Sequence, residues 1–198
     1  NTLAAPDTIN TWKLTATNSG LLSNILAYSS IEKLVGHSQS DTLDFSAYAS
    51  ARAVVITGAG SLDGYVGTDS SLGLGFDNIN ILVGSALDDT LTGPDVVNTW
   101  KITAANSGSL NDILNFSSIE KLVGGGQSDT LNFSAYPSAR SIIMTGDGSL
   151  DGYAGTESSL ALSQGFDNFN VLIGSAFDDT LTGPDTLNTW KITAANSG

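Results

Sequence analysis

The chain has 198 residues, no cysteine, 20 acidic and 7 basic residues, and a formal net charge of −13 at pH 7. This charge disfavours binding to nucleic acid or to anionic membranes, and the lack of cysteine excludes disulfides and thiolate metal sites. No segment approaches the roughly 20 apolar residues of a membrane helix, and no signal peptide is visible at the start. Small cations are the partners that the charge favours.

One segment recurs three times along the chain. It reads NTWKLTATNSG at 10–20, NTWKITAANSG at 98–108 and NTWKITAANSG again at 188–198, so the copies lie 88 and 90 residues apart. Units of this length that recur in tandem are typical of repeat architectures, in which each unit buries its apolar face against its neighbours. We expect one continuous rod in which 1–9 ends a preceding repeat, 10–97 and 98–187 are two solenoid repeats, and 188–198 begins a third. The chain is interpreted as a piece of a longer array.

Each repeat divides into four shorter segments, which in the second copy are 99–118, 119–140, 141–165 and 166–188. Every segment contains a strand-like run, a small or Gly-rich turn, an Asp and a second short strand. β-Branched and aromatic residues fill the runs, while Gly, Asn, Ser and Asp interrupt them every few residues, which disfavours helix. The sequence therefore predicts an all-β fold, a right-handed parallel β-helix or β-solenoid with about four coils per repeat.

The alternation of residues in NTWKITA predicts which side chains enter the core. Trp100 and Ile102 fall on one face of the strand, with Thr and Lys on the other. We therefore expect Trp12, Trp100 and Trp190 to point inward. The segment IEKLVG at 119–124 has no clear phase, because either Ile119, Lys121 and Val123 or Glu120 and Leu122 could face the core.

Four acidic turns share a common pattern. They read GHSQSDTL at 36–43, GSALDDTL at 84–91, GGGQSDTL at 124–131 and GSAFDDTL at 174–181. The pattern resembles the nonapeptide G-G-x-G-x-D-x-U-x of the RTX, or haemolysin-type, calcium-binding repeats found in giant secreted and cell-surface bacterial adhesins and haemagglutinin-like proteins. It departs from that family at the second-half glycine, which is Gln39, Leu87, Gln127 or Phe177, and in the irregular spacing between turns.

The resemblance implies that Asp side chains and turn carbonyls hold calcium. Matched by position, the family's Asp corresponds to Asp41, Asp89, Asp129 and Asp179, and its core residue corresponds to Leu43, Leu91, Leu131 and Leu181. The turns GAGSLDGY at 58–65 and GDGSLDGY at 146–153 match less closely and add Asp63 and Asp151. The doubled Asp88/Asp89 and Asp178/Asp179 are the strongest candidates for calcium turns.

Stacking of coils gives a separate argument about these acids. The alignment of the segments places eight polar residues in one column, about 5 Å apart in successive coils: Asn24, Asp41, Asp63, Asp89, Asp112, Asp129, Asp151 and Asp179. Carboxylates at that spacing repel one another, and a bound hard cation would offset the repulsion. Hydrogen bonds from turn N–H groups, as in Asx turns, would also stabilise them without a metal. Both explanations are open at this stage.

Catalytic residues are scarce. His37 is the single histidine and is replaced by Gly125 in the second repeat, which indicates a solvated turn residue rather than a general base. Arg52 and Arg140 recur close to Tyr48 and Tyr136, and a cation–aromatic contact at a corner is the favoured interpretation. We expect no enzymatic activity.

The repeat favours a structural role. We expect a rigid extracellular or bacterial cell-surface rod for projection, adhesion or filament assembly, with calcium as a stabilising ion. Its partners would be neighbouring repeats of the same chain, further copies joined end to end, or a cell-surface glycan, and neither nucleic acid nor membrane insertion is expected. The alternative is a carbohydrate-binding module on a solenoid scaffold, which would require exposed aromatic side chains on a flat face.

Overall fold

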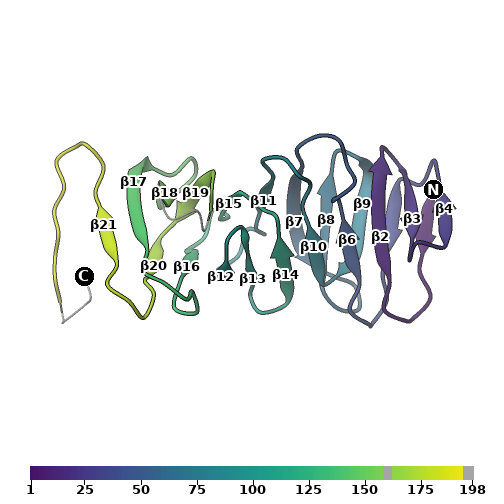
Figure 1. Ribbon diagram of the computed structural model, residues 1–198, viewed down its shortest axis with the longest axis horizontal. Coiled ribbons are helices and arrows are strands. Elements are labelled where there is room, and N and C mark those ends of the chain that lie inside the picture. The colour runs from purple at the N-terminus through teal and green to yellow at the C-terminus, as the bar shows by residue number, and fades with distance from the viewer. Residues whose placement is uncertain (158–161, 194–198) are drawn as a thin grey trace.

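Strands are the only regular secondary structure in residues 1–157 and 162–193, which a computed structural model describes (Figure 1). The short β-branched and aromatic runs form the strands, and the Gly-, Asn- and Ser-rich segments form the turns between them. The all-β prediction is confirmed. These residues contain no helix long and apolar enough to cross a membrane.

The strands form two large mixed sheets, of 11 and 10 strands. The first sheet contains, in spatial order, β1 (Thr2–Ala4), β5 (Lys33–Val35), β9 (Leu72–Ile79), β8 (Tyr65–Asp69), β7 (Ala53–Ala59), β11 (Thr90–Thr92), β15 (Lys121–Val123), β19 (Gly165–Phe169), β18 (Tyr153–Glu157), β17 (Ser141–Asp147) and β21 (Thr180–Thr182). The second sheet contains β20 (Val171–Ile173), β16 (Thr130–Asn132), β12 (Thr99–Ala104), β13 (Ser107–Leu110), β14 (Leu114–Ser117), β10 (Ile81–Val83), β6 (Thr42–Asp44), β2 (Thr11–Ala16), β3 (Ser19–Leu22) and β4 (Leu26–Tyr28).

Antiparallel meanders interrupt the parallel pairing. Each repeat has one three-stranded meander in each sheet, β2–β3–β4 and β7–β8–β9 in the first copy and β12–β13–β14 and β17–β18–β19 in the second. Within each meander the chain steps back toward the N-terminal end, since β14 lies beside β10 while β12 lies beside β16. The turn residues Asn18 and Asn106 adopt positive φ angles of 52° and 51°, which Asn tolerates better than most residues. The expected all-parallel pairing is thus replaced by mixed sheets.

The meanders change the count of layers in a repeat. The second repeat supplies β14, β13, β12, β16 and β20 to one sheet and β15, β19, β18, β17 and β21 to the other. That is five strand positions in each sheet, where the sequence suggested about four coils. The molecule is elongated, with the strands across its long axis and with β4 and β21 toward opposite ends (Figure 1).

The core lies between the two sheets. Trp12, Trp100, Leu43, Leu91 and Leu131 are all fully buried, as predicted. The ring of Trp100 in β12 lies 6.1 Å from the ring of Phe169 in β19, which is an edge-to-face contact across the two sheets. The segment IEKLVG follows neither alternative completely. Leu122 in the middle of β15 is fully buried, as Leu34 is in β5, but Ile119 just before β15 is also fully buried and Glu120 is only partly buried.

The prediction for Trp190 is wrong. Its side chain is 56% exposed, and Leu181, which was expected in the core, is 44% exposed. Trp100 occupies a strand between β13 and β16, whereas residues 183–193 pair with no described strand. Burial of this side chain therefore depends on the layers that follow it, and its own sequence does not supply them.

No break marks the boundary between the two repeats. β10 pairs with β14 and β11 pairs with β15, both in parallel. Thr90 lies opposite Lys121 across this boundary, in the register that places Thr2 opposite Lys33 between β1 and β5. The two boundaries between repeats therefore share one register, and their pairing is parallel like that of β6 with β10 and of β16 with β20 inside the repeats.

Candidate functional site

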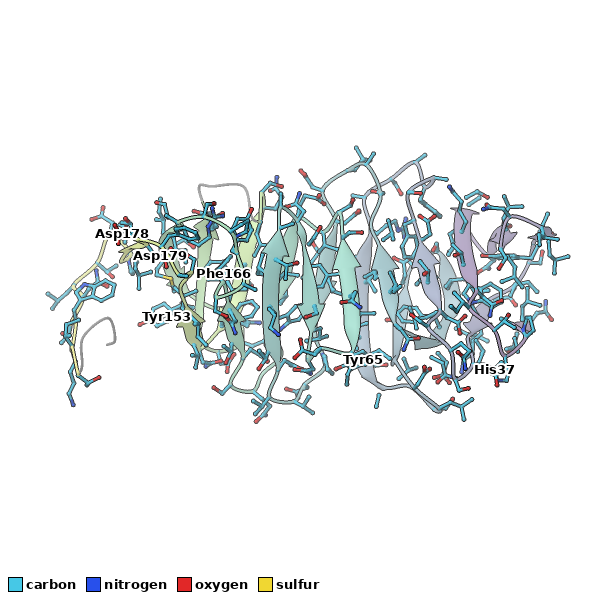
Figure 2. The ribbon with its side chains drawn as sticks, turned by 60° about the horizontal axis from the view of Figure 1, so that its bottom comes forward. His37, Tyr65, Tyr153, Phe166, Asp178 and Asp179 are labelled. Carbon is cyan, nitrogen blue, oxygen red and sulfur yellow. The ribbon has the colours of Figure 1, made fainter. Side chains whose placement is uncertain are left out.

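Turns connect the two sheets along two opposite edges of the molecule. At the first edge the chain passes from the 11-stranded to the 10-stranded sheet, as between β5 and β6, and at the second edge it returns, as between β10 and β11. Strands that pair in parallel share one direction within each sheet. The turns that leave a sheet therefore lie at one edge of the molecule, and the turns that enter it lie at the opposite edge. Figure 2 shows His37 and Tyr65 at one edge and Asp178 and Asp179 at the other.

The structure divides the eight acids predicted as calcium ligands between these edges. The first edge carries Asp41, Asp63, Asp129 and Asp151. The second edge carries Asp88, Asp89, Asp178 and Asp179. The candidate calcium turns therefore do not form one stacked array. The repulsion expected between carboxylates in a single column does not arise, and it gives no argument for a bound cation.

Asp41 and Asp129 are buried at the first edge and occupy equivalent positions. The Asp129 Oδ1 atom accepts from the Asn98 backbone N–H at 2.9 Å and from its side-chain amide at 2.7 Å, and Oδ2 accepts from the Gly125 N–H at 2.5 Å. Asp41 has the same three kinds of donor, with Asn10 and His37 in these roles. Burial raises the pKa of the Asp129 carboxyl, and these hydrogen bonds oppose that rise.

The backbone of the same residues continues the network into the next layer. The Asp129 N–H donates to Asn170 Oδ1 at 2.9 Å, and the Asp129 carbonyl oxygen accepts from the backbone N–H groups of Asn170 and Val171. Asn80 and Ile81 provide the equivalent contacts to Asp41. Each aspartate is thus surrounded by N–H donors and joins three successive turns.

Asp89 is the buried aspartate of the second edge. Its carboxylate accepts from the backbone N–H groups of Arg52 and Ser85 and, at 3.0 Å, from the Ser85 hydroxyl. Its own N–H donates to Glu120 Oε2 at 2.8 Å. Burial raises the pKa of the Glu120 carboxyl, the hydrogen bond from Asp89 lowers it, and the charges of Asp89 and Asp88 raise it. An acid therefore occupies the position that Asn170 fills at the first edge.

Asp179 repeats the side-chain contacts of Asp89. Its carboxylate accepts from the Arg140 N–H at 2.6 Å and from the Ser175 N–H and hydroxyl at 2.6 and 2.7 Å. The residue is exposed, because no described strand follows β21 in the sheet. The neighbouring Asp88 and Asp178 are also exposed, and Asp88 accepts from the Gln164 amide at 3.0 Å.

Asp63 and Asp151 lie in the hairpin turns at the first edge. One oxygen of each accepts from the side-chain amide of the Asn in the neighbouring turn, Asn80 at 3.2 Å and Asn170 at 3.1 Å. Burial raises the pKa of the Asp63 carboxyl, the Asn80 amide lowers it, and the charges of Asp41 and Asp7 raise it. The other oxygen, Oδ1, is buried and has no hydrogen-bond partner among the described residues in either copy.

The buried aspartates fit a structural role better than calcium coordination. Every oxygen of Asp41, Asp89 and Asp129 already accepts from an N–H or O–H group, so a cation would have to displace those donors. Within residues 1–157 and 162–193, no three His, Asp or Glu side chains gather as a metal-binding group. The Oδ1 atoms of Asp63 and Asp151 are buried carboxylate oxygens with no donor to displace, and Asp88 and Asp178 expose their carboxylates to solvent. The prediction of calcium binding rests on these four side chains.

Arginine braces the second edge. The Arg52 guanidinium lies 4.2 Å from the Tyr48 ring centre, and Arg140 lies 3.7 Å from Tyr136, which confirms the predicted cation–aromatic contacts. Arg52 also donates to Asp69 at 2.8 Å, and both side chains are buried. The sequence interpretation missed this acid partner.

Sequence reasoning also missed the asparagines and Glu120. The available signal was that these residues are identical in the two copies. Asn10 and Asn98 begin the segment NTWK, and Asn80 and Asn170 end the segments FDNIN and FDNFN. Their hydrogen-bonding role could not be inferred without knowing which turns are neighbours. The chain matches no protein-family model, no curated protein and no solved structure.

Proposed function

We propose that this chain is a non-catalytic structural segment of a large bacterial extracellular or cell-surface protein, in which repeats wind into a rigid β-solenoid rod. Parallel crossovers are almost always right-handed, so the winding is expected to be right-handed as well. The rod would project or space other domains. Its RTX-like turns support the extracellular location by resemblance.

One observation carries this proposal, namely the continuity of the junction between repeats. The pairs β10–β14 and β11–β15 join the two copies without a linker, and Leu91 and Leu122 on either side of the junction are both fully buried. Relative motion of the repeats would expose these side chains and break both ladders. Each added repeat would therefore extend the same pair of sheets.

The length of the rod follows from the layer count. Five strand positions per sheet at a spacing of about 4.8 Å give about 24 Å for each repeat of this kind. The edge networks support rigidity, because hydrogen bonds from Asp41, Asp89 and Asp129 link turns in successive layers.

The test is the length of tandem proteins with two, four and six repeats. Small-angle X-ray scattering should show the maximum dimension increasing by about 24 Å per repeat while the cross-section stays constant. Growth with the square root of repeat number, or a cross-section that varies with length, would indicate flexible beads and contradict the rod.

The carbohydrate-binding alternative has less support in this structure. The recurring Trp12 and Trp100 are fully buried and unable to stack on a sugar. The recurring Tyr48 and Tyr136 are partly buried, and their rings contact Arg52 and Arg140. Tyr153, Phe177 and Trp190 are exposed, but all three lie near the end of the chain at which the sheets lack a following layer. A glycan contact would therefore not recur along the rod.

A further inference from the structure

Three exposed apolar side chains lie at the first edge, near the middle of the molecule. Leu62 is 63% exposed, Val97 is 67% exposed and Ile113 is 48% exposed. They come from the hairpin between β7 and β8, the turn between β11 and β12, and the hairpin between β13 and β14. We call these three side chains the junction patch, because they come from both sides of the boundary between the two repeats.

The three turns are joined by Asn111, which lies in the third of them. Its side-chain amide donates to the Tyr65 hydroxyl and to Asn98 Oδ1, both at 3.0 Å. Tyr65 follows directly after the hairpin that carries Leu62, and Asn98 ends the turn that carries Val97. Figure 2 shows Tyr65 at this edge, near the middle of the molecule. The junction patch is therefore one surface, held in place by buried and half-buried hydrogen bonds.

The exposure of the junction patch does not result from a missing layer. β7 and β8 lie inside the 11-stranded sheet, and β13 and β14 lie inside the 10-stranded sheet, each with a described strand on both sides. Val97 leads into β12, which lies between β13 and β16. The rod already has its full packing at this point, so its own core does not require apolar residues at these positions.

The apolar character of the patch positions recurs along the chain. Leu62 corresponds to Leu150, Ile113 to Ile25, and Val97 to Ile9 and Leu187. Neighbouring exposed positions change instead, since Val96 corresponds to Thr8 and Thr186. Single exposed apolar side chains are common on protein surfaces. A group of them that stays apolar in each copy and is held in one place indicates an interaction surface.

Acidic side chains surround the junction patch. Each patch residue lies within two positions of an aspartate in the sequence, and these are Asp63, Asp95 and Asp112. Asp95 is exposed, and its Oδ1 accepts from the Gly126 N–H at 2.9 Å, which fixes the carboxylate without neutralising it. The Lys101 ammonium lies 3.0 Å from Asp112 and balances that charge. Asp63 and Asp95 leave the patch with excess negative charge.

The charge of the whole edge has the same sign. Among the residues that the structure describes, no Lys or Arg lies in the turns of the first edge. These turns contain Asp7, Asp41, Asp63, Asp95, Asp112, Asp129, Asp151 and Asp185. Such an edge repels a second copy of itself and attracts cationic partners. The charge therefore identifies the kind of molecule that can cover the apolar patch.

We propose that the junction patch binds a basic amphipathic peptide segment of a partner protein. The apolar side chains of that segment cover Leu62, Val97 and Ile113, and its Lys or Arg side chains pair with Asp63 and Asp95. The site needs residues from both sides of a repeat boundary, so a tandem array has one site at each boundary. Sites about 24 Å apart on one edge of a rod would bind a multivalent partner with avidity. This inference goes beyond the proposed function, because a single boundary suffices for binding.

Fluorescence anisotropy of the full chain with a labelled peptide of alternating Lys and Leu tests the proposal. We expect saturable binding that weakens as salt rises, because salt screens the ion pairs. A peptide of alternating Lys and Ser should bind about tenfold more weakly or worse, and a peptide of alternating Glu and Leu should not bind. Absence of binding by the first peptide would overturn the proposal. Equal binding by the Lys and Ser peptide would also overturn it, because the net charge of −13 alone would then explain the attraction.

Leu62→Ser combined with Val97→Ser locates the apolar contact. We expect peptide binding to weaken by about tenfold or more, while circular dichroism and the thermal melt stay unchanged because both side chains are exposed. The matched control is Leu74→Ser in β9, since Leu74 is 64% exposed and lies toward the second edge. Equal weakening by the control would place the binding outside the junction patch.

Asp95→Asn tests the charge at the same site. The amide oxygen still accepts from the Gly126 N–H, so the turn keeps its hydrogen bond while one charge is lost. We expect binding of the Lys and Leu peptide to weaken by about twofold to fivefold. Asp88→Asn makes the same change in net charge at the second edge and should have no effect. Equal effects of the two variants would show attraction to the whole molecule and contradict a local site.

Tandem proteins with two, four and six repeats count the sites. The number of peptides bound at saturation should rise by one for each added repeat boundary. A number that stays constant as boundaries are added would contradict a site built at the boundary. The length of the same proteins in solution tests the rod separately, so the two proposals can fail independently.

Discussion

The two edges of the molecule hold the same kind of buried aspartate in different surroundings. At the first edge, Asp129 has neutral partners, with Asn98 donating to its carboxylate and Asn170 accepting from its backbone N–H. At the second edge, Asp89 accepts from the Ser85 hydroxyl, and its backbone N–H donates to the carboxylate of Glu120. The comparison shows that N–H and O–H donors suffice to stabilise a buried carboxylate. The residue that the next layer places beside the aspartate differs, because it is the neutral Asn170 at the first edge and the acidic Glu120 at the second.

Breaking the arginine brace of the second edge should have the largest effect. Arg52 and Asp69 have side-chain exposures of 4% and 0%, so Arg52→Met leaves a buried carboxylate without its cation. We expect a loss of about 3–5 kcal/mol in the free energy of unfolding, measured by urea denaturation. The control is Lys33→Met, which removes a more exposed ion pair at 3.8 Å to Asp77 and should cost less than about 1 kcal/mol. Similar small losses for both variants would show that hydrogen bonds from Ser71 alone stabilise Asp69.

Removing a buried aspartate of the first edge should have the next largest effect. Asp129→Ala leaves the Asn98 and Gly125 donors unsatisfied, and each buried unpaired group costs about 1–3 kcal/mol. We expect a loss of about 3 kcal/mol in the same denaturation assay. The exposed Asp88→Ala should change stability by less than about 0.5 kcal/mol. Equal losses for the two variants would contradict the assignment of Asp129 as a structural acceptor.

The sequence predicted the core of this fold well because alternation depends only on local periodicity. Trp100 and Leu131 are buried for the reason that the pattern indicates, and Arg140 contacts Tyr136 because both belong to one corner. The exposure of Trp190 could not be predicted from alternation, since its burial requires neighbouring layers. Periodicity identifies the inward face of a strand but not what covers it.

The sequence could not assign the acidic turns to edges. GSALDDTL and GGGQSDTL look alike, yet the first follows a strand of the 10-stranded sheet and the second follows a strand of the 11-stranded sheet. Strands of three residues such as β10 and β15 carry no signal of sheet or direction. The backward meanders also separate sequence neighbours, so the proximity of Glu120 to Asp89 appears only in the structure.

The extra acid at the second edge should make stability depend on pH. Burial raises the pKa of Glu120 above its usual value of 4.5, so the folded protein holds this proton more tightly than the unfolded chain does. The stabilising contribution is therefore present below about pH 4.5 and is lost as the pH rises through the raised pKa. Urea denaturation from pH 4 to pH 8 should show a shallower fall in stability for Glu120→Gln than for the native chain.

A control for the pH experiment has the opposite sign. The Lys101 ammonium, 3.0 Å away, lowers the pKa of the exposed Asp112. The contribution of the ionised Asp112 to the free energy of unfolding is present above its usual pKa of 3.8 and is lost as the pH falls through the lowered pKa. Asp112→Asn should therefore reduce stability slightly near neutral pH. Identical pH profiles for Glu120→Gln and the native chain would show that the Asp89–Glu120 contact does not couple protonation to folding.

Calcium should have the smallest effect on either edge. The buried aspartates already have N–H and O–H donors, which leaves the unpartnered Oδ1 atoms of Asp63 and Asp151 at the first edge and the exposed Asp88 and Asp178 at the second edge as the available ligands. So few ligands favour weak binding, and a site with a dissociation constant of about 1 mM would add about 1.4 kcal/mol at 10 mM calcium. Thermal melts followed by circular dichroism should therefore shift by only a few degrees between calcium and EDTA, and Asp63→Asn with Asp151→Asn should remove the shift. A large loss of β signal on chelation would instead indicate that Asp41, Asp89 and Asp129 are metal ligands. It would contradict the conclusion that N–H and O–H donors alone stabilise the buried aspartates at both edges.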